Sequence, residues 1–240
     1  MAKSGVHFHF KHFSVRHDVA AMKVGTDGVL LGAWASIDAA HYILDIGTGS
    51  GVIALMLAQR SAPDVVIDAI ELEATEAELA RENIDSSPWP GKVNVYTSAI
   101  QDFRPGMKYD AIVSNPPYFI QSQESPDLRR TQSRHTVTLS YPQLLDAVEA
   151  LLTEDGTFHT ILPNAEGLQF ITLAASRGLH CTRQWSFRTR KEKPIERWLL
   201  EFSRKTSSVT PGTGEILLYD QGTDWSEYYR KLTKEFYLNA

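Results

Sequence analysis

The run from position 42 reads Tyr42-Ile43-Leu44-Asp45-Ile46-Gly47-Thr48-Gly49-Ser50-Gly51, in which mostly apolar residues lead into three closely spaced glycines. The apolar part predicts a buried strand, and residues 51–60, which are apolar on most sides, predict a deeply packed helix. Glycines between them permit a tight turn and let a ligand approach the backbone. The run therefore predicts an α/β fold with a ligand site at this turn.

Strand and helix patterns alternate along the rest of the chain. Further strands are predicted over residues 65–70, 93–96, 109–113, 156–162, 181–189 and 196–202, and helices over 75–84, 141–152, 166–176 and 224–237. This alternation is typical of a mostly parallel sheet with helices on both faces. The last two strands follow each other directly and predict a hairpin. We therefore expect seven strands with the last one antiparallel, and a ligand at the carboxyl ends of the parallel strands.

The composition indicates one globular domain. The chain has 240 residues, of which 42% are hydrophobic and 22% charged, a balance that argues against disorder. Its longest clean apolar run, residues 52–58, is too short to span a membrane. Cys181 is the only cysteine, which excludes an internal disulfide and a cysteine zinc cluster. Because the N-terminus lacks the apolar core of a signal peptide, we expect a cytoplasmic protein.

The charges are unevenly distributed. The formal net charge is -5, which excludes a uniformly basic surface for binding nucleic acid. Residues 71–85 carry six acids and one arginine, whereas residues 183–205 carry eight Lys or Arg and three Glu. Residues 1–23 carry four Lys or Arg and one Asp. A single charged run is usually a solvated surface, but two basic runs can still converge on one face of the fold.

The glycine spacing and a carboxylate downstream indicate the kind of cofactor. The glycine spacing is G-x-G-x-G. Val52 stands where the dinucleotide-binding pattern G-x-G-x-x-G has its third glycine, which argues against a nicotinamide dinucleotide as the cofactor. Glu71 ends the second predicted strand, where α/β nucleotide sites place a carboxylate that accepts both ribose hydroxyls. Together, Gly47 to Gly51 and Glu71 resemble the motifs of class I S-adenosylmethionine-dependent methyltransferases. The resemblance implies their Rossmann-like fold, and it places Asp45 near the cationic amino acid end of the cofactor.

The next strand leads directly into Asn115-Pro116-Pro117-Tyr118, which matches an amino-methyltransferase signature. Two prolines can simply end a strand. The chemistry of methyl transfer to an adenine N6, however, needs these residue types, because that lone pair is delocalised into the ring. The Asn115 side-chain oxygen and the Pro116 carbonyl can accept the two amine hydrogens and localise the lone pair, with Pro116 and Pro117 fixing the backbone. The Tyr118 ring can stack on the base.

The N-terminal segment extends the resemblance. Phe13 to Asp18, Ala21 to Trp34, Leu44 to Gly51, Ile70 to Glu73 and Asn115 to Tyr118 together resemble the bacterial tRNA1(Val) adenine-37 N6-methyltransferase family. The resemblance implies tRNA as the substrate, position 37 as the target and S-adenosylmethionine as the cofactor. It also implies that residues 1–40 pack as a covering segment on a methyltransferase domain of residues 41–240, all within one domain. The cofactor residues it implies are Lys23, Gly25, Thr26, Asp27, Asp45, Gly47, Thr48, Gly49, Gly51, Glu71, Leu72, Ala99 and Asn115.

One position departs from this pattern. Many relatives carry an acid after the third strand that meets the cofactor's adenine amine, and here Ala99 stands in its place. The backbone amide of Ala99, or the side chain of Asp102, is left to serve instead.

Basic residues are predicted to gather at the ligand edge of the sheet. The sixth strand, if parallel, ends there, and the segment after Tyr118 also begins there. The candidate RNA-binding residues are Lys11, Arg16, Arg129, Arg130, Arg134, Arg190, Lys191 and Lys193. Histidines 7, 9, 12 and 17 crowd the N-terminus, but their alternation with phenylalanines fits an ordinary strand, so we expect no metal site. We expect a monomer or a weak oligomer.

Two other functions remain open from the sequence. A protein-glutamine N5-methyltransferase uses the same Asn-Pro-Pro-Tyr chemistry on a side-chain amide, although the N-terminal segment argues against it. A non-catalytic RNA-binding module would keep the fold without the activity. The intact Gly47, Gly49, Glu71 and Asn115 argue against that second alternative.

Overall fold

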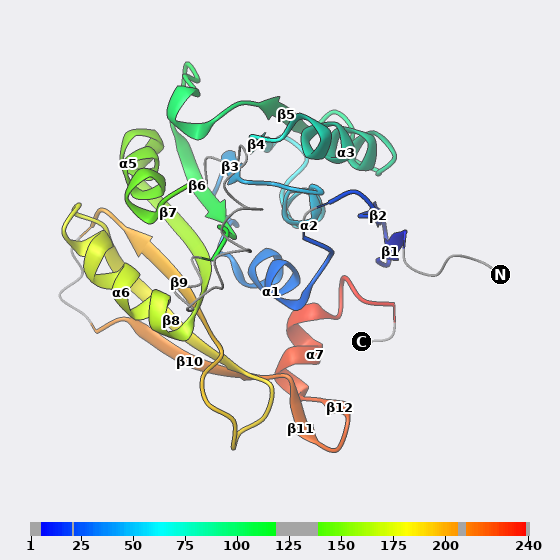
Figure 1. Ribbon diagram of the computed structural model, residues 1–240, viewed down its shortest axis with the longest axis vertical. Helices are drawn as coiled ribbons and strands as arrows, with labels where there is room; N and C mark the ends of the chain where they lie inside the picture. Colours follow the sequence, from blue (N-terminus) through cyan, green and yellow to red (C-terminus); the bar gives the residue numbers. More distant parts are fainter. Residues whose placement is uncertain (1–5, 21, 119–138, 206–209, 239–240) are drawn as a thin grey trace, which may run out of the picture.

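A computed structural model describes residues 6–20, 22–118, 139–205 and 210–238. Its main sheet has eight strands in the order β10-β8-β9-β7-β6-β3-β4-β5 (Figure 1). The strands are β3 (Tyr42–Ile46), β4 (Val66–Glu71), β5 (Val93–Thr97), β6 (Tyr109–Ser114), β7 (Leu152–Pro163), β8 (His180–Arg188), β9 (Arg197–Ser203) and β10 (Gly212–Leu217). All neighbouring pairs are parallel except those that β9 makes with β7 and β8. The predicted mostly parallel α/β fold and its antiparallel hairpin are thus present.

Smaller elements surround this sheet. Two short hairpins lie outside it, β1 (His7–His9) with β2 (Ser14–Arg16) and β11 (Tyr219–Gln221) with β12 (Asp224–Trp225). The helices are α1 (Thr26–Trp34), α2 (Val52–Arg60), α3 (Ala74–Asp85), α5 (Tyr141–Leu151), α6 (Asn164–Ala175) and α7 (Glu227–Thr233), with a short 3-10 helix η1 (Ile100–Asp102).

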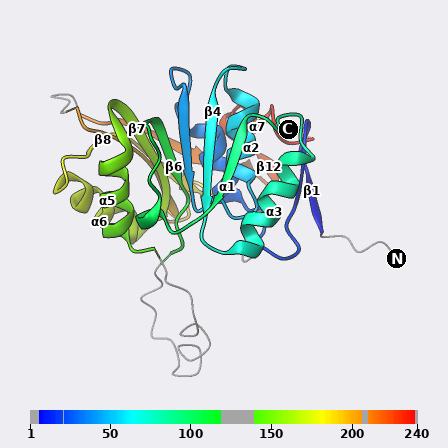
Figure 2. The ribbon, with the colours of Figure 1, turned by 90° about the horizontal axis from the view of Figure 1, so that it is seen from above.

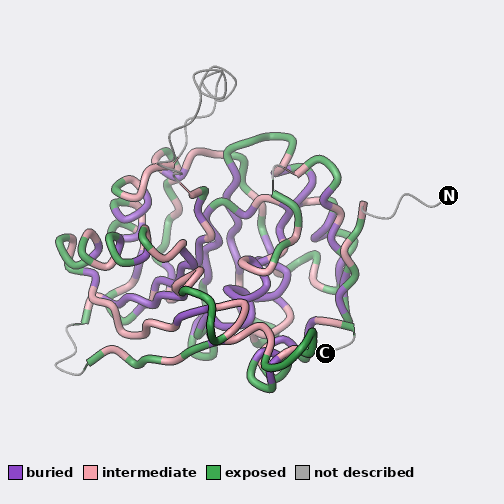
Figure 3. Tube along the Cα trace, turned by 60° about the horizontal axis from the view of Figure 1, so that its bottom comes forward, coloured by how far each residue is buried: buried purple, intermediate pink, exposed green. Residues whose placement is uncertain are grey.

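Alternating side chains of the strands build a separate core on each face of the sheet. Ile43 packs into the cluster formed with α1, α2 and α7, whereas its neighbour Leu44 packs into the cluster formed with α5 and α6. The helices therefore cover both faces (Figure 2), and the buried strands run through the middle of the molecule (Figure 3). The first cluster also takes in Val15 of β2, so the N-terminal segment shares the core of the sheet.

Two elements differ from the prediction. The sheet contains eight strands instead of seven because β10 adds at its edge, parallel to β8. The sequence of β10, Gly-Thr-Gly-Glu-Ile-Leu, has little of the apolar alternation that predicts a strand. At Gly214 the Trp185 ring occupies the place that a side chain would take. The last helix is also shorter than predicted. It begins after Ser226, whose hydroxyl accepts a hydrogen bond from the Tyr229 amide at 3.0 Å, and residues 224–225 form β12.

Candidate active site

The glycine turn between β3 and α2 is held open toward the ligand edge. Gly47 has a φ of 73°, which favours glycine, and no atom lies within 4 Å of the position that its Cβ would occupy. The amides of Gly47 and Thr48 both donate to the Ile70 carbonyl, at 2.9 and 3.0 Å, which ties the turn to β4. The turn therefore leaves a backbone-walled space that a side chain would otherwise fill.

Glu71 joins the same turn from the end of β4. Its Oε2 accepts from the Gly49 amide at 2.9 Å, and its Oε1 accepts from the Glu73 amide at 3.0 Å. The side chain is 9% exposed. Because each carboxylate oxygen has a second lone pair, Glu71 can still accept two hydroxyl hydrogens from a ligand while the backbone holds it in place.

Asp45 lies fully buried beneath the turn. Its Oδ2 accepts from the Thr48 hydroxyl at 2.6 Å, and the Ala54 backbone amide also faces the carboxylate. Burial raises the pKa of Asp45 to about 7; hydrogen bonds with the Thr48 hydroxyl and the Ala54 amide oppose the rise, and the charge of Glu71 adds to it. Asp45 can thus place a buried carboxyl group under a cationic ligand.

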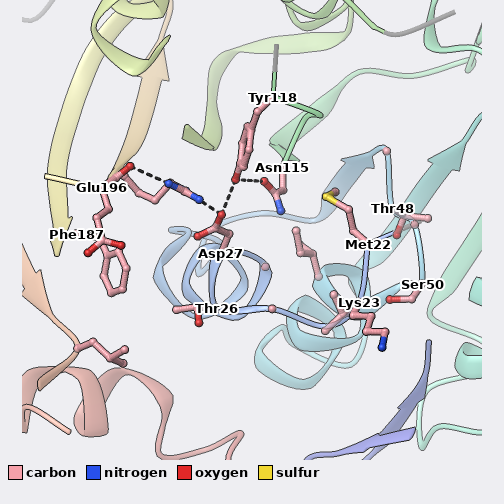
Figure 4. A pocket seen from close by; sticks show the side chains of 18 of the residues that line it. Met22, Lys23, Thr26, Asp27, Thr48, Ser50, Asn115, Tyr118, Phe187 and Glu196 are labelled. Atoms are coloured by element: carbon pink, nitrogen blue, oxygen red, sulfur yellow. Dashed lines mark hydrogen bonds and ion pairs between the residues drawn. The ribbon is translucent and has the colours of Figure 1, made fainter. Parts of the chain in front are cut away.

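The end of β6 brings Asn115 and Tyr118 against the first helix and the hairpin strand β9. The Tyr118 hydroxyl lies 2.7 Å from Asp27 Oδ2 and 3.0 Å from Asn115 Oδ1. Arg197 Nε donates to the same Asp27 oxygen at 2.9 Å, and the guanidinium lies 5.1 Å from the centre of the Tyr118 ring. Figure 4 shows Asp27, Tyr118 and Asn115 joined in this chain of contacts.

These contacts change the acidity of two groups. Burial, together with the charge of Asp27 and its hydrogen bond, raises the pKa of the Tyr118 hydroxyl, which stays protonated. Burial lowers the pKa of Arg197, but its hydrogen bond and ion pair with Asp27 outweigh this effect and the pKa rises.

Two pockets meet at Asn115. The Asp27 pocket, of about 400 Å³, and the Glu71 pocket, of about 260 Å³, share Met22, Gly47, Gly49 and Asn115 as lining residues. Of the predicted site residues, the Asp27 pocket is lined by Lys23, Gly25, Thr26, Asp27, Gly47, Thr48, Gly49, Asn115 and Tyr118. The Glu71 pocket is lined by Gly47, Gly49, Glu71, Leu72, Asn115, Pro116 and Pro117.

Three predicted cofactor residues line neither pocket. Asp45 lies below the turn, Gly51 precedes the first residue of α2 with a φ of 82°, and Ala99 precedes η1. Ser98 and Ile100, on either side of Ala99, line the Glu71 pocket instead.

The prediction missed several lining residues that come from distant parts of the chain. Phe187, Thr189, Glu196 and Arg197 reach the Asp27 pocket from the β8–β9 hairpin. The predicted direction of the sixth strand already implied that this hairpin would reach the ligand edge. No local motif, however, marked Arg197 as a partner of Asp27.

The candidate RNA-binding residues fall into three groups. Arg190, Lys191 and Lys193 lie in the β8–β9 connection, next to Thr189 and Glu196 of the Asp27 pocket. Of these, Arg190 is engaged within the protein, because its guanidinium donates to the Gly222 carbonyl and lies 5.2 Å from the centre of the Tyr219 ring. Arg16 is paired with Glu82 at 2.8 Å and with Asp18 at 3.1 Å, and the Lys11 ammonium donates to the Lys234 carbonyl, so both are engaged within the protein. The remaining candidates lie outside the described residues, namely Arg129, Arg130 and Arg134.

The described part of the chain contains no group of three or more His, Cys, Asp or Glu that could hold a metal ion. Within the same residues, no helix combines the length and the apolar character that crossing a membrane requires.

Solved structures share this fold. A predicted O-methyltransferase from Agrobacterium tumefaciens superimposes with a TM-score of 0.67 at 16% identity, over 88% of this chain and 96% of its own. A glycopeptide N-methyltransferase solved with S-adenosyl-L-homocysteine superimposes with a TM-score of 0.55 at 11% identity, over 75% of this chain and 89% of its own. At these identities the likeness concerns the Rossmann-like methyltransferase fold.

Sequence relatives are more specific. Residues 24–139 match the family model of the methyltransferase small domain. A tRNA1(Val) (adenine(37)-N6)-methyltransferase from Bacteroides thetaiotaomicron is 44% identical over 97% of both chains. Its namesakes from Actinobacillus succinogenes and Escherichia coli strain SE11 are 43% and 42% identical, covering 98% and 96% of this chain and 99% and 94% of their own. With such identity over nearly the whole length, this chain belongs to the tRNA1(Val) (adenine(37)-N6)-methyltransferase family.

Proposed function

We propose that this protein transfers a methyl group from S-adenosylmethionine to the N6 of an adenosine in tRNA, at position 37 of tRNA1(Val), in the cytoplasm. The observation that carries the proposal is that Asn115 lines both pockets, so that a donor in one and an acceptor amine in the other would meet at its side chain. Family membership supports the choice of adenine and of tRNA.

The residues fit the cofactor. The open space above Gly47 and the buried Asp45 carboxyl group beneath it suit a ligand that carries positive charge close to the backbone. Glu71 would hold the ribose hydroxyls, with Ile70 and Leu72 beside the adenine. When bound, S-adenosylmethionine supplies an electrophilic methyl group on a sulfonium. The charge of Asp45 would favour that cation over the neutral product of its demethylation.

Asn115 and Pro116 would then act on the substrate amine. Two acceptors that hold the two N6 hydrogens localise the nitrogen lone pair and aim it at the methyl carbon. No general base is needed before transfer, because the methylated nitrogen is acidic and loses its proton afterwards. Alignment of the nitrogen, methyl and sulfur would supply much of the rate. The Tyr118 ring, which has the Arg197 guanidinium over one face, would stack on the target base.

The basic hairpin tip would meet the RNA backbone. Lys191 and Lys193 lie in the connection between Thr189 and Glu196, which line the Asp27 pocket, and would meet the phosphates that flank an inserted base. A base in an anticodon loop is already unpaired, so its insertion costs less than flipping a base from a duplex.

The proposal is tested by incubating the protein with labelled S-adenosylmethionine and either tRNA that lacks the modification or a release factor. We expect label on tRNA adenine. Label on protein would replace this proposal with a glutamine methyltransferase. Retained RNA binding without label would indicate a non-catalytic module.

A further inference from the structure

The Tyr118 hydroxyl has two acceptors and one hydrogen. Asp27 Oδ2 lies 2.7 Å away and Asn115 Oδ1 lies 3.0 Å away. The carboxylate is the nearer acceptor and carries charge, and charge-assisted hydrogen bonds are about twice as strong as neutral ones. The hydrogen therefore belongs to the Asp27 contact, and the Tyr118 oxygen faces Asn115 with its lone pairs.

That assignment decides how the Asn115 amide is turned. An amide oxygen that faces a hydroxyl lone pair is repelled, whereas an amide nitrogen in the same place donates a hydrogen bond. Rotating the amide by 180° exchanges oxygen and nitrogen within the same outline. With the nitrogen toward Tyr118, the Asn115 oxygen points away from the tyrosine and into the pockets.

Arg197 holds Asp27 in place within this series of contacts. Its Nε lies 2.9 Å from the same Asp27 oxygen, and both side chains are largely shielded from water, at 28% and 22% exposed. The positive charge keeps Asp27 an acceptor, which obliges Tyr118 to donate to it. Asp27 is the second residue of α1, while Arg197 is the first residue of β9, so the contact spans 170 residues of sequence.

The geometry points to Asp27 and Arg197 as positioning residues that act through the Tyr118 hydroxyl to turn the Asn115 oxygen toward the target amine. This inference rests on the proposed function, since it names what prepares Asn115 for an NH2 substrate. It gives the Tyr118 hydroxyl a role distinct from stacking, because stacking needs only the ring.

The first test needs no substrate. The protein is labelled with 15N on its asparagine side chains. If the Asn115 NH2 group donates to the Tyr118 oxygen, the hydrogen in that bond resonates downfield of the other hydrogen on the same nitrogen. Tyr118→Phe removes that acceptor and keeps the ring, so we expect the resonance to move upfield. The matched control is Tyr42→Phe, at an exposed tyrosine, which should leave the signal in place. An Asn115 signal that is unchanged in Tyr118→Phe overturns the inference.

The second test is a double-variant cycle on turnover. Tyr118→Phe and Asp27→Asn should each lower kcat at least about tenfold, as expected for a lost preorganised contact, with KM for tRNA nearly unchanged. The double variant should be no slower than Tyr118→Phe alone, because both changes break one chain. Asp64→Asn, at an exposed aspartate, is the control.

The outcomes separate this inference from the proposed function. Additive losses would show that Asp27 does not act through Tyr118. A Tyr118→Phe variant with normal kcat would show that the Tyr118 hydroxyl does not position Asn115, and either result overturns the inference. A wild-type protein that labels no tRNA would refute the proposed function, and the Asn115 resonance would still report whether the contact chain exists.

Discussion

At the scale of single residues, some members of the site are marked by the local sequence and others are brought together only by the fold. Asn115, Glu71 and the glycines were predictable because local spacing marks them. The pairing of Asp27 with Tyr118 and Arg197 was not, since its members lie 91 and 170 residues apart and only the fold unites them. Ala99 likewise carried no local sign that its neighbours Ser98 and Ile100 would line the pocket.

Asp45 predicts a pH dependence of stability. Its pKa in the folded protein is about 7, well above that of an aspartate in an unfolded chain, so the folded state binds the proton more tightly. The proton on Asp45 contributes fully to the free energy of unfolding below the pKa of the unfolded state. This contribution is lost as the pH rises to about 7, by up to about 1.4 kcal/mol per pH unit. We expect Asp45→Asn to raise the unfolding free energy relative to the wild type increasingly from pH 4 to 7, in urea titrations without cofactor. Parallel pH profiles would contradict this.

Glu71 predicts a loss of cofactor affinity. Glu71→Ala removes the acceptor of the Gly49 amide and the carboxylate proposed to hold both ribose hydroxyls, so calorimetry should show S-adenosylmethionine binding weakened at least about tenfold. Glu78→Ala, on the exposed side of α3, is the matched control and should bind normally. Equal affinities of the two variants would remove Glu71 from the cofactor site.

At the scale of elements, the β8–β9 hairpin brings positive charge to the ligand edge of an acidic protein. The alternation of strands and helices was predictable from apolar periodicity, and the hairpin from two strands without a helix between them. The edge strand β10 was not predictable, because Gly214 in it is explained only by the Trp185 ring that packs over it.

This placement predicts the salt dependence of tRNA binding. The double variant Lys191→Ala, Lys193→Ala should bind tRNA more weakly, and the slope of log affinity against log salt should fall in magnitude by about 1 to 2. The control variant Arg104→Ala, Lys108→Ala removes two exposed charges before β6, at the opposite edge of the sheet. A hairpin variant whose slope matches the control would exclude the hairpin from the RNA interface.

At the scale of the whole molecule, the segments around Phe10 and Phe236 pack together, although they lie far apart in the sequence. Phe10 pairs with Tyr237 in an isolated bridge, and the Lys11 amide donates to the Phe236 carbonyl at 2.8 Å. Because Phe10 and Phe236 share the core cluster of α1 and α2, we propose that residues 1–40 and 41–240 form a single domain.

That packing predicts that Phe236 contributes to the stability of the whole domain. Phe236 is 2% exposed, so Phe236→Ala should lower the unfolding free energy by about 3–5 kcal/mol in urea titrations. Leu238→Ala, two residues further and 58% exposed, should change it little. If the two variants were equally stable, the C-terminal segment would not be part of the domain core.

The central claim is that Asn115 prepares an adenine amine for methylation. It is tested most directly by nucleoside mass spectrometry of unmodified tRNA1(Val) after single turnover with the wild type and with Asn115→Ala. We expect N6-methyladenosine at position 37 from the wild type, and formation at least about 100-fold slower from the variant, with S-adenosylmethionine still bound. An Asn115→Ala variant that methylates adenine at the wild-type rate would contradict the mechanism.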